Sequence, residues 1–328
     1  MMRIGVLGPT DPDSFADNIG YSLVRMGHTV EYLGPARPVQ RSRTVVRVSE
    51  LAWQAYPGLE SRAHCKVVSK AIDTRQDLVI CTNAGLAPDA VALLRKNKIN
   101  VGLWFPDAVA NLGRMRMLSA PYTALFFKDS LLVQRLRDTL DLPIWYLPEA
   151  CNPQWHRPIG DVGAQKHIVV IGNTYLSRLM LLRRLCDDGI PIKIYGSSIP
   201  KWAPHVLPGS CHTGRSVRRE EKSRVFREAA GVLNNLHPAE MTSVNARLFE
   251  ATGAGAAVLC EDRPSLSEHY DVGREVFAFS CYKDLVERAR ELLADRDLVK
   301  VIGDAASKRA HAQHCYEARL TIALEKLA

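Results

Sequence analysis

Residues 3–33, RIGVLGPTDPDSFADNIGYSLVRMGHTVEYL, contain a complete strand–helix–strand unit. Arg3–Leu7 is a short apolar run typical of a buried strand, and Thr29–Leu33 predicts the next strand. Between them, Ser14–Met26 repeats its apolar side chains at helical spacing, and Gly27 fits the end of that helix. The unit predicts two parallel strands joined by a covering helix.

The same alternation continues along the chain. In the first half, further strands are expected at residues 77–81, 101–105, 122–127 and 144–147. After a proline-rich stretch at 147–158 the pattern restarts, with strands expected at residues 167–171, 192–195, 231–234 and 256–259. Helices are expected at residues 177–187, 218–229, 244–252 and 282–294. The predicted fold class is therefore α/β, with parallel sheets covered by helices on both faces.

This organisation predicts two Rossmann-like, doubly wound domains that face a cleft. An N-terminal domain is expected over residues 1–150, a linker over 151–165 and a C-terminal domain over 166–300. The helical residues 301–328 could pack back on the first domain. Open α/β sheets bind ligands at the carboxyl ends of their strands. We therefore expect the active site in the cleft, shared by both domains.

The composition is that of a globular protein, because 47% of the 328 residues are hydrophobic and 24% are charged. The formal net charge of +8 attracts anions in general. The sequence has neither zinc-finger spacing nor an aromatic RNA-binding strand, so no nucleic acid partner is expected. No apolar run reaches the roughly 20 residues of a membrane-spanning helix. The start lacks a signal-peptide pattern, so a cytoplasmic location is expected.

Two glycine-containing segments argue against a dinucleotide site and a P-loop. Pro9 stands where a dinucleotide-binding helix would begin, and the Gly-x-Gly-x-x-Gly pattern is missing there. Thr252–Ala257 follows a helix and precedes a strand, the reverse of a P-loop, so its glycines are expected to cap the helix and allow close packing. The eight cysteines are scattered without a Cys-x-x-Cys pair, which favours reduced thiols over a metal site.

Polar residues gather after one strand of the second domain. Val232–His237 is typical of a strand that ends in a loop, and Asn245, Arg247 and Glu250 follow on the next helix. Their spacing allows the three side chains to cluster at the helix start or the cleft, although simple amphipathicity would also place polar residues there. The spacing alone leaves both interpretations open.

Several motifs occur in the order found in one enzyme family. They are NNLHP at residues 234–238, NARLFEATGAGA at 245–256, SEHYDVGREV at 267–276 and HCYEAR at 314–319. Over these residues the chain resembles the C-terminal domain of the CgeB-like glycosyltransferases, which are related to the group 1 glycosyltransferases and have the GT-B fold. The resemblance is looser at IGNTYLSR (171–178) and IYG (194–196), and in the first 150 residues it rests on WFPD (104–107) and the Rossmann pattern.

The resemblance implies a glycosyltransferase that holds a nucleotide-sugar donor, linked to UDP, GDP or dTDP, in the second domain. No other cofactor is expected, and no metal ion is required, because basic residues and helix dipoles can stabilise the diphosphate. Glu250 would accept hydrogen bonds from the ribose hydroxyls, while Arg178 and Arg247 would neutralise the diphosphate. Further donor contacts are expected from the surrounding loops, at Gly172, Asn173, Thr174, Tyr195, Gly196, Glu240 and Asn245. The loop after Gly196 would form a wall of the base pocket.

One position departs from the group 1 pattern. Many retaining members carry another glutamate eight residues before the ribose-binding one, where this chain has Thr242. The role of contacting the sugar then falls to Glu240, His237 or the backbone. The stereochemistry of the transfer stays open.

Catalysis by inversion needs a base near the acceptor. Asp107, at a strand end of the first domain, is the first candidate for this base, and Asp13 and Asp17 come next. A helix N-cap is the alternative role for Asp107. His237 could contact the donor sugar or phosphate, or bond to the backbone at its strand end.

Three features also have plainer interpretations. Arg178 could be a solvated helix residue. Residues 215–224 carry mixed charges at helical spacing, which predicts a solvated amphipathic helix, with donor recognition by one of its first residues left open. Trp155 could stack on a sugar or pack within the linker.

Two other functions remain compatible with the sequence. One is a nucleotide-sugar epimerase on the same fold, and the other is a non-catalytic GT-B-like binding protein. The acceptor could be a glycan, a natural product or a protein, and a homodimer is left open. The arginine-rich composition is typical of a bacterium with a GC-rich genome.

Overall fold

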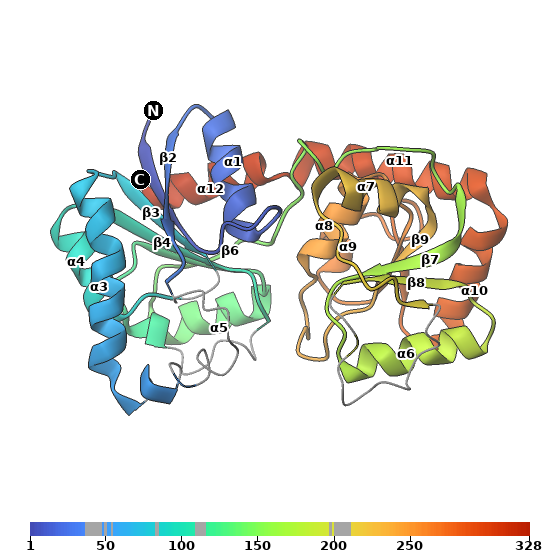
Figure 1. The fold of residues 1–328 in the computed structure, drawn as a ribbon, viewed down its shortest axis with the longest axis horizontal. Helices are drawn as coiled ribbons and strands as arrows, with labels where there is room; N and C mark the ends of the chain where they lie inside the picture. Colours follow the sequence, from blue (N-terminus) through green and yellow to red (C-terminus); the bar gives the residue numbers. More distant parts are fainter. Residues whose placement is uncertain are drawn as a thin grey trace. The chain divides into compact units, whose positions relative to one another are not determined.

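The computed structural model describes residues 1–36, 48, 51–53, 55–82, 85–108, 116–196, 199 and 211–328. These residues form two compact units. Unit 1 comprises Met1–Pro148 and Tyr316–Ala328, and unit 2 comprises Glu149–Cys315. Each unit has one parallel sheet covered by helices, so the predicted α/β class with two Rossmann-like sheets is confirmed (Figure 1).

Unit 1 contains a six-stranded parallel sheet in the order β2-β1-β3-β4-β5-β6. Its strands are β1 (Arg3–Leu7), β2 (Thr29–Gly34), β3 (Leu78–Thr82), β4 (Asn100–Phe105), β5 (Ala124–Phe127) and β6 (Ile144–Tyr146). Its helices include α1 (Phe15–Arg25), α3 (Pro57–Asp73), α4 (Pro88–Lys96), the 3-10 helix η2 (Arg116–Ser119), α5 (Ser130–Leu140) and α12 (Tyr316–Leu327).

The side chains of β4 show how the two faces of this sheet are covered. Leu103 and Phe105 belong to the core to which α3, α4 and α5 contribute. Trp104 instead packs edge-on against Phe15 of α1, at 4.9 Å between ring centroids, and lies 6.1 Å from Tyr316 of α12. Successive residues of a strand point to opposite faces. Helices α1 and α12 therefore cover one face, and α3, α4 and α5 cover the other (Figure 1).

Unit 2 contains a five-stranded parallel sheet in the order β11-β10-β9-β7-β8. Its strands are β7 (Gln165–Ile171), β8 (Ile192–Tyr195), β9 (Ala229–Asn234), β10 (Val258–Glu261) and β11 (Phe277–Phe279). Its helices include α6 (Leu176–Asp187), α7 (Arg219–Glu228), α8 (Ala246–Gly253), α9 (Leu266–His269), α10 (Tyr282–Ala294) and α11 (Arg296–Gln313).

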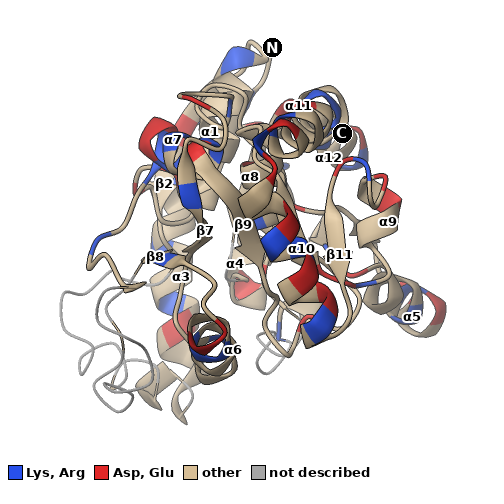
Figure 2. Ribbon diagram, turned by 90° about the vertical axis from the view of Figure 1, so that its right-hand side faces the viewer, with Lys and Arg blue, Asp and Glu red and all other residues tan. Residues whose placement is uncertain are grey.

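Helical spacing explains which sides of these helices are buried. Leu179, Leu182 and Leu185 follow one face of α6 and share a core with α10 and the start of α11. Phe226 of α7 and Phe249 of α8 are fully buried in unit 2. The outer side of α10 carries charges of both signs (Figure 2), as an ion pair between Arg288 and Glu291 illustrates. Mixed charge of this kind is typical of a solvated face.

The C-terminal residues, predicted as one charged helix, form two helices in different units. The helical pattern breaks at His314, whose carbonyl accepts a hydrogen bond of 2.9 Å from the Cys151 amide. Helix α11 before the break belongs to unit 2, and α12 after it belongs to unit 1. Leu320 of α12 is fully buried, and the Asn100 side chain donates to the Leu327 carbonyl at 2.8 Å. Residues 151–165, expected as a linker, belong to unit 2.

The strand pattern located the sheets well but overlooked some shorter or more polar elements. Strand β11 has three residues and helix α9 has four, too few for a periodic pattern. Helix α3 buries few side chains, among them His64, Val68 and Ala71, so its apolar stripe is weak in the sequence. In the described parts of the chain, we find no helix that is both long and apolar enough to span a membrane.

Candidate functional site

The carboxyl ends of β7 and β8 approach each other through two glycines. The Gly172 amide donates to the Tyr195 carbonyl at 2.9 Å. Both Gly172 and Gly196 have positive φ, at 136° and 150°. A Cβ atom on Gly196 would lie 2.2 Å from the Gly172 oxygen. Gly196 therefore has to be glycine for the two strand ends to lie this close, and the positive φ of Gly172 also favours glycine.

Arg178 is a buried residue that shapes the loop after β7, so its interpretation as a solvated helix residue is wrong. Its Nη1 donates to the Asn173 carbonyl at 2.7 Å, and its Nε and Nη2 donate to the Oδ1 and carbonyl oxygens of Asn235, both at 2.8 Å. The guanidinium also stacks on Tyr175 at 4.5 Å. Burial lowers the pKa of Arg178, and the nearby positive charge of Arg247 lowers it further.

Arg178 and Arg247 converge on Gly172. A methyl group on Gly172 would lie 3.2 Å from Nη2 of Arg247 and 3.4 Å from Nη1 of Arg178. Arg178 comes from α6 and Arg247 from α8, two helices that begin after neighbouring strands of the sheet. Two guanidinium groups at one point of the backbone create a position that favours a multiply charged anion.

Glu250 is held between two cations. It is 7% exposed, and its Oε1 lies 2.9 Å from Nζ of Lys222 while its Oε2 lies 2.8 Å from Nη1 of Arg247. The Lys222 side chain is 4% exposed. Burial of a lysine together with a carboxylate is tolerated where the two are paired. The site therefore presents an oriented carboxylate beside the anion position at Gly172.

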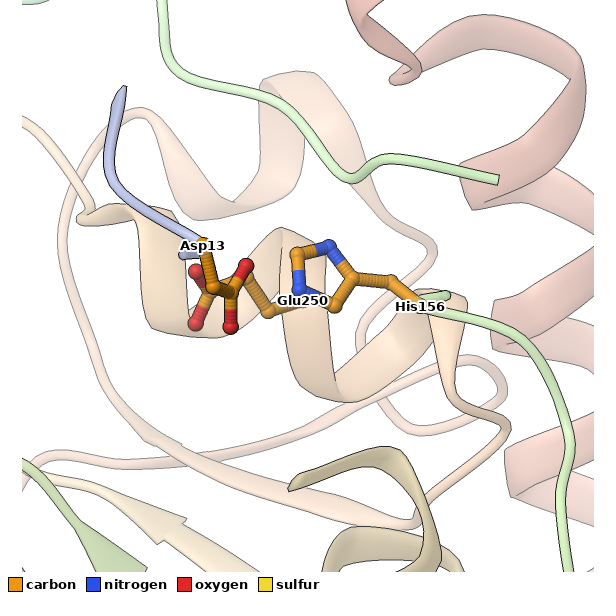
Figure 3. Close-up of side chains that lie close together, drawn as sticks. All are labelled: Asp13, His156 and Glu250. Carbon is orange, nitrogen blue, oxygen red and sulfur yellow. The ribbon is translucent and has the colours of Figure 1, made fainter. Parts of the chain in front are cut away.

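His156 adds an imidazole to this cluster. Figure 3 shows His156, from the segment before β7, beside Glu250 of α8, and a ring nitrogen and a carboxylate oxygen lie within 4.8 Å. The Asn152 amide donates to Nδ1 of His156 at 2.9 Å. Because Nδ1 is an acceptor, the ring carries its proton on Nε2. His156 is fully buried.

The loop after β9 carries His237 and Glu240. His237 is exposed, and its ring lies edge-on to Tyr175 at 4.9 Å between centroids. Its Nδ1 accepts from the Ala239 amide at 3.1 Å, the backbone bond that was its alternative interpretation. Glu240 is 6% exposed and accepts from Ser243 Oγ at 2.6 Å. Both residues thus have local structural contacts in addition to any role toward a ligand.

The other expected donor residues of unit 2 surround the same strand ends. Asn245 is the N-cap residue of α8 but makes no capping bond, and its Oδ1 is buried without a hydrogen-bond partner among the described residues. Tyr195 is buried, with Arg215 at 5.5 Å over its ring. Asn173 is exposed and Thr174 is half-buried. The loop expected as the base wall, residues 197–198 and 200–210, lies outside the described residues.

The expected acceptor-side residues lie in unit 1. Asp107 is exposed and is separated from the end of β4 by Pro106. The N-cap role predicted for Asp107 depends on residues 109–115, which lie outside the described part of the chain. Asp17 lies in the first turn of α1, where its carboxylate accepts from the Asp13 amide at 2.7 Å. Asp13 has a positive φ of 68°, so this bond stabilises a tight turn.

Lys222 and His156 were missed by the sequence interpretation. Residues 215–224 were expected to be solvated, and Arg215, Glu221 and Arg224 are exposed, but Lys222 and Ser223 face inward. The available signal was spacing, because Lys222 precedes the apolar Phe226 by one helical turn. Trp155 is 2% exposed and lies under Arg219, at 4.5 Å from the guanidinium carbon, which favours the packing role over stacking on a sugar.

The chain is similar to known proteins both in part of its sequence and in its fold. Residues 178–325, less than half of the chain, match the model of a family described as glycosyl transferase-like. The fold is similar to that of sucrose-phosphate synthase from Thermosynechococcus elongatus, with a TM-score of 0.70 and 12% identity over 99% of this chain and 98% of that one. No curated protein matches the sequence.

Two further solved structures share the fold over the whole chain. Anabaena HepE, in complex with UDP and glucose, has a TM-score of 0.64 and 11% identity and covers 100% of both chains. AviGT4, a glycosyltransferase involved in avilamycin A biosynthesis, has a TM-score of 0.64 and 14% identity over 100% of this chain and 97% of that one. The predicted GT-B fold is confirmed by these likenesses, and the enzyme class expected from the sequence, a glycosyltransferase, is confirmed by the family match together with the fold.

Proposed function

We propose that the protein transfers a glycosyl group from a nucleotide-sugar donor to an acceptor hydroxyl, with the donor bound in unit 2. The observation that carries this proposal is the convergence of Arg178 and Arg247 on Gly172, beside the oriented carboxylate of Glu250. The family match includes both arginines and the glutamate. The fold neighbour HepE binds UDP and glucose, which makes UDP-sugars the first donors to test.

Each part of the donor has a partner among these residues. The diphosphate would lie against Gly172, Asn173 and Thr174, with Arg178 and Arg247 balancing its charge. The start of α8 at Asn245 would add backbone amides to the same anion. The ribose hydroxyls would donate to Glu250. The base would lie near Tyr195 and Gly196, and the sugar near His237 and Glu240.

In the transfer step, the acceptor oxygen forms a bond to the anomeric carbon as the bond from that carbon to the diphosphate oxygen breaks. The negative charge that grows on the leaving diphosphate is stabilised by the two guanidinium groups. The hydroxyl proton goes either to the leaving diphosphate or to a carboxylate of unit 1, for which Asp107 and Asp17 are the candidates. These residues supply the charge without a metal ion, so we propose a metal-independent reaction.

We also propose that the chain belongs to the CgeB-like branch of the glycosyltransferases, because its motifs between residues 234 and 319 occur in the order typical of that branch. The acceptor would be a glycan, a natural product or a protein.

The test is donor binding followed by turnover. Thermal unfolding of the full chain is measured with UDP, GDP, dTDP and their sugars, because a ligand at about 100 times its dissociation constant stabilises the folded state by about 2.7 kcal/mol. We expect one nucleotide family to stabilise the wild type but not Glu250→Ala. Glu220→Ala, an exposed glutamate on α7, is the matched control and should behave as the wild type.

Turnover then separates the enzyme classes. Release of the nucleoside diphosphate with a glycosylated product supports the proposal. Conversion of the donor to an epimer without any acceptor would make the protein an epimerase. Binding of nucleotide without turnover across glycan, natural-product and protein acceptors would refute the proposal in favour of a binding protein.

A further inference from the structure

Lys222 is a buried cation that does not contact the donor in the function proposed for this site. Contacts of the neighbouring residues on α7 orient its side chain toward the interior of unit 2. Ser223 Oγ donates to the Trp155 carbonyl at 2.7 Å, and the Arg219 guanidinium covers the Trp155 ring. These contacts fasten the first turns of α7 to the segment that bears His156. The Lys222 ammonium then reaches Oε1 of Glu250 at 2.9 Å.

Arg247 has two tasks that compete. Its Nη1 lies 2.8 Å from Oε2 of Glu250, while its Nη2 faces Gly172, where the diphosphate is proposed to lie. The Arg247 side chain is 27% exposed, so it is less confined than Lys222 at 4%. A guanidinium drawn toward a buried carboxylate is less available to a phosphate, because both anions compete for the same donors.

Lys222 relieves this competition. With Lys222 in place, the charge of Glu250 is balanced from the α7 side, and Arg247 can turn toward an anion at Gly172. Without it, Glu250 would draw on Arg247 more strongly, since an uncompensated buried carboxylate is costly. Its oxygens would also lose the contact that fixes the direction of Oε1.

We propose that Lys222 is a positioning residue for the donor: it holds the Glu250 carboxylate toward the ribose and thereby leaves Arg247 available to the diphosphate. This inference rests on the donor site proposed above. It makes two measurable claims. Lys222 should govern discrimination between ribose and 2′-deoxyribose, and it should act on the diphosphate only through Glu250.

The first experiment measures binding of UDP, GDP, their 2′-deoxy counterparts and inorganic pyrophosphate to the full chain by calorimetry. The variants are Lys222→Met, which removes the charge at similar length, Lys222→Arg, which keeps it, and Arg224→Met, which removes an exposed charge from the same helix. Lys222→Met should weaken binding of the ribonucleotide ~10-fold and bring its preference over the 2′-deoxy form close to one. Lys222→Arg should retain the preference, and Arg224→Met should change neither quantity.

The second experiment combines Lys222→Met with Glu250→Gln. Removing both charges leaves a neutral pair of similar size, which tolerates burial better than one unpaired charge. We expect Lys222→Met to have no further effect on pyrophosphate binding in the Glu250→Gln background, because the Glu250 charge that draws Arg247 away from the diphosphate has been removed. If Lys222→Met alone does not fold, the ribose preference and the pyrophosphate affinity are compared between the wild type, Lys222→Arg, Glu250→Gln and the double variant.

The outcomes separate the two proposals. A wild type that binds none of the nucleotides would refute the donor site, and with it the role of Lys222. A wild type that prefers the ribonucleotide, with an unchanged preference in folded Lys222→Met, would overturn only the role of Lys222. Lys222→Met could also weaken pyrophosphate binding equally in the wild type and in Glu250→Gln. Lys222 would then act on the diphosphate directly through its charge, and its role as a positioning residue would be overturned.

Discussion

Replacing Gly196 by alanine should destabilise unit 2 through both backbone strain and steric overlap. The same replacement at Gly189 serves as a control that has the strain alone. Gly196 has a φ of 150°, and a Cβ there would lie 2.2 Å from the Gly172 oxygen. Gly189, after α6, also has a positive φ, of 77°, but a Cβ there would meet no atom within 4 Å. Gly189→Ala therefore carries only the backbone strain, while Gly196→Ala carries strain and overlap.

The magnitudes follow from these contacts. Strain at a positive φ costs about 1 kcal/mol for alanine at Gly189. At Gly196 the overlap adds about 2–3 kcal/mol, because the β7 and β8 backbones must separate by about 1 Å. At roughly 2–4 °C per kcal/mol, Gly196→Ala should lower the melting temperature by roughly 10 °C and Gly189→Ala by roughly 3 °C.

Differential scanning calorimetry of the two variants measures these shifts. Because Gly172 must move in Gly196→Ala, that variant should also lose nucleotide binding, whereas Gly189→Ala should keep it. Melting temperatures of the two variants within about 2 °C of each other would refute the close approach of β7 and β8 as the reason for this glycine.

Three further outcomes are expected. Leu320→Ala, which empties a fully buried position of α12, should destabilise unit 1 by about 2–5 kcal/mol, while the exposed Ile322→Ala on the same helix should change calorimetric stability little. Burial, and to a smaller extent the charge of Lys193, lower the pKa of His167 to about 4 in the folded protein. Between this value and the ordinary pKa of about 6.5, the unfolded chain therefore binds a proton at His167 that the folded protein does not bind. Stability is then lost as the pH falls below about 6.5, and His167→Asn should show a smaller fall in melting temperature between about pH 7 and pH 4.5; an equal fall contradicts this. Donor turnover should persist in EDTA, and activity that disappears and returns with Mg²⁺ would contradict the metal-independent proposal.

The sequence was most informative where a pattern is local. The apolar runs that became β1 and β7 are buried strands in the structure, because each run is long enough for a sheet covered on both faces. The loop glycines Gly172 and Gly196 were also singled out from the sequence, and the structure shows them in close backbone contact, while their place in a ligand site stays a prediction. Such patterns can be interpreted from adjacent residues alone, without the tertiary contacts made by residues far apart in the sequence.

The cluster around Glu250 could be predicted only in part. Its proximity to Arg247 follows from their spacing of three residues on one helix. Its contacts with Lys222 and His156 join segments that are far apart in the sequence, and such contacts depend on tertiary packing. Lys222 lies in a run of charged residues that is typical of a solvated helix, and only its helical spacing from Phe226 distinguishes it from the other charged residues of that run.

The return of α12 to unit 1 has a consequence for how the chain is made. Unit 2 is one continuous segment, Glu149–Cys315, whereas unit 1 is made of two segments on either side of it. Helix α12, with its buried Leu320, therefore leaves the ribosome only after all of unit 2. Domains usually fold in the order in which they are synthesised. Here the unit that begins second is the first to have all of its residues available, and the sheet face of unit 1 that packs against α12 stays uncovered for longer.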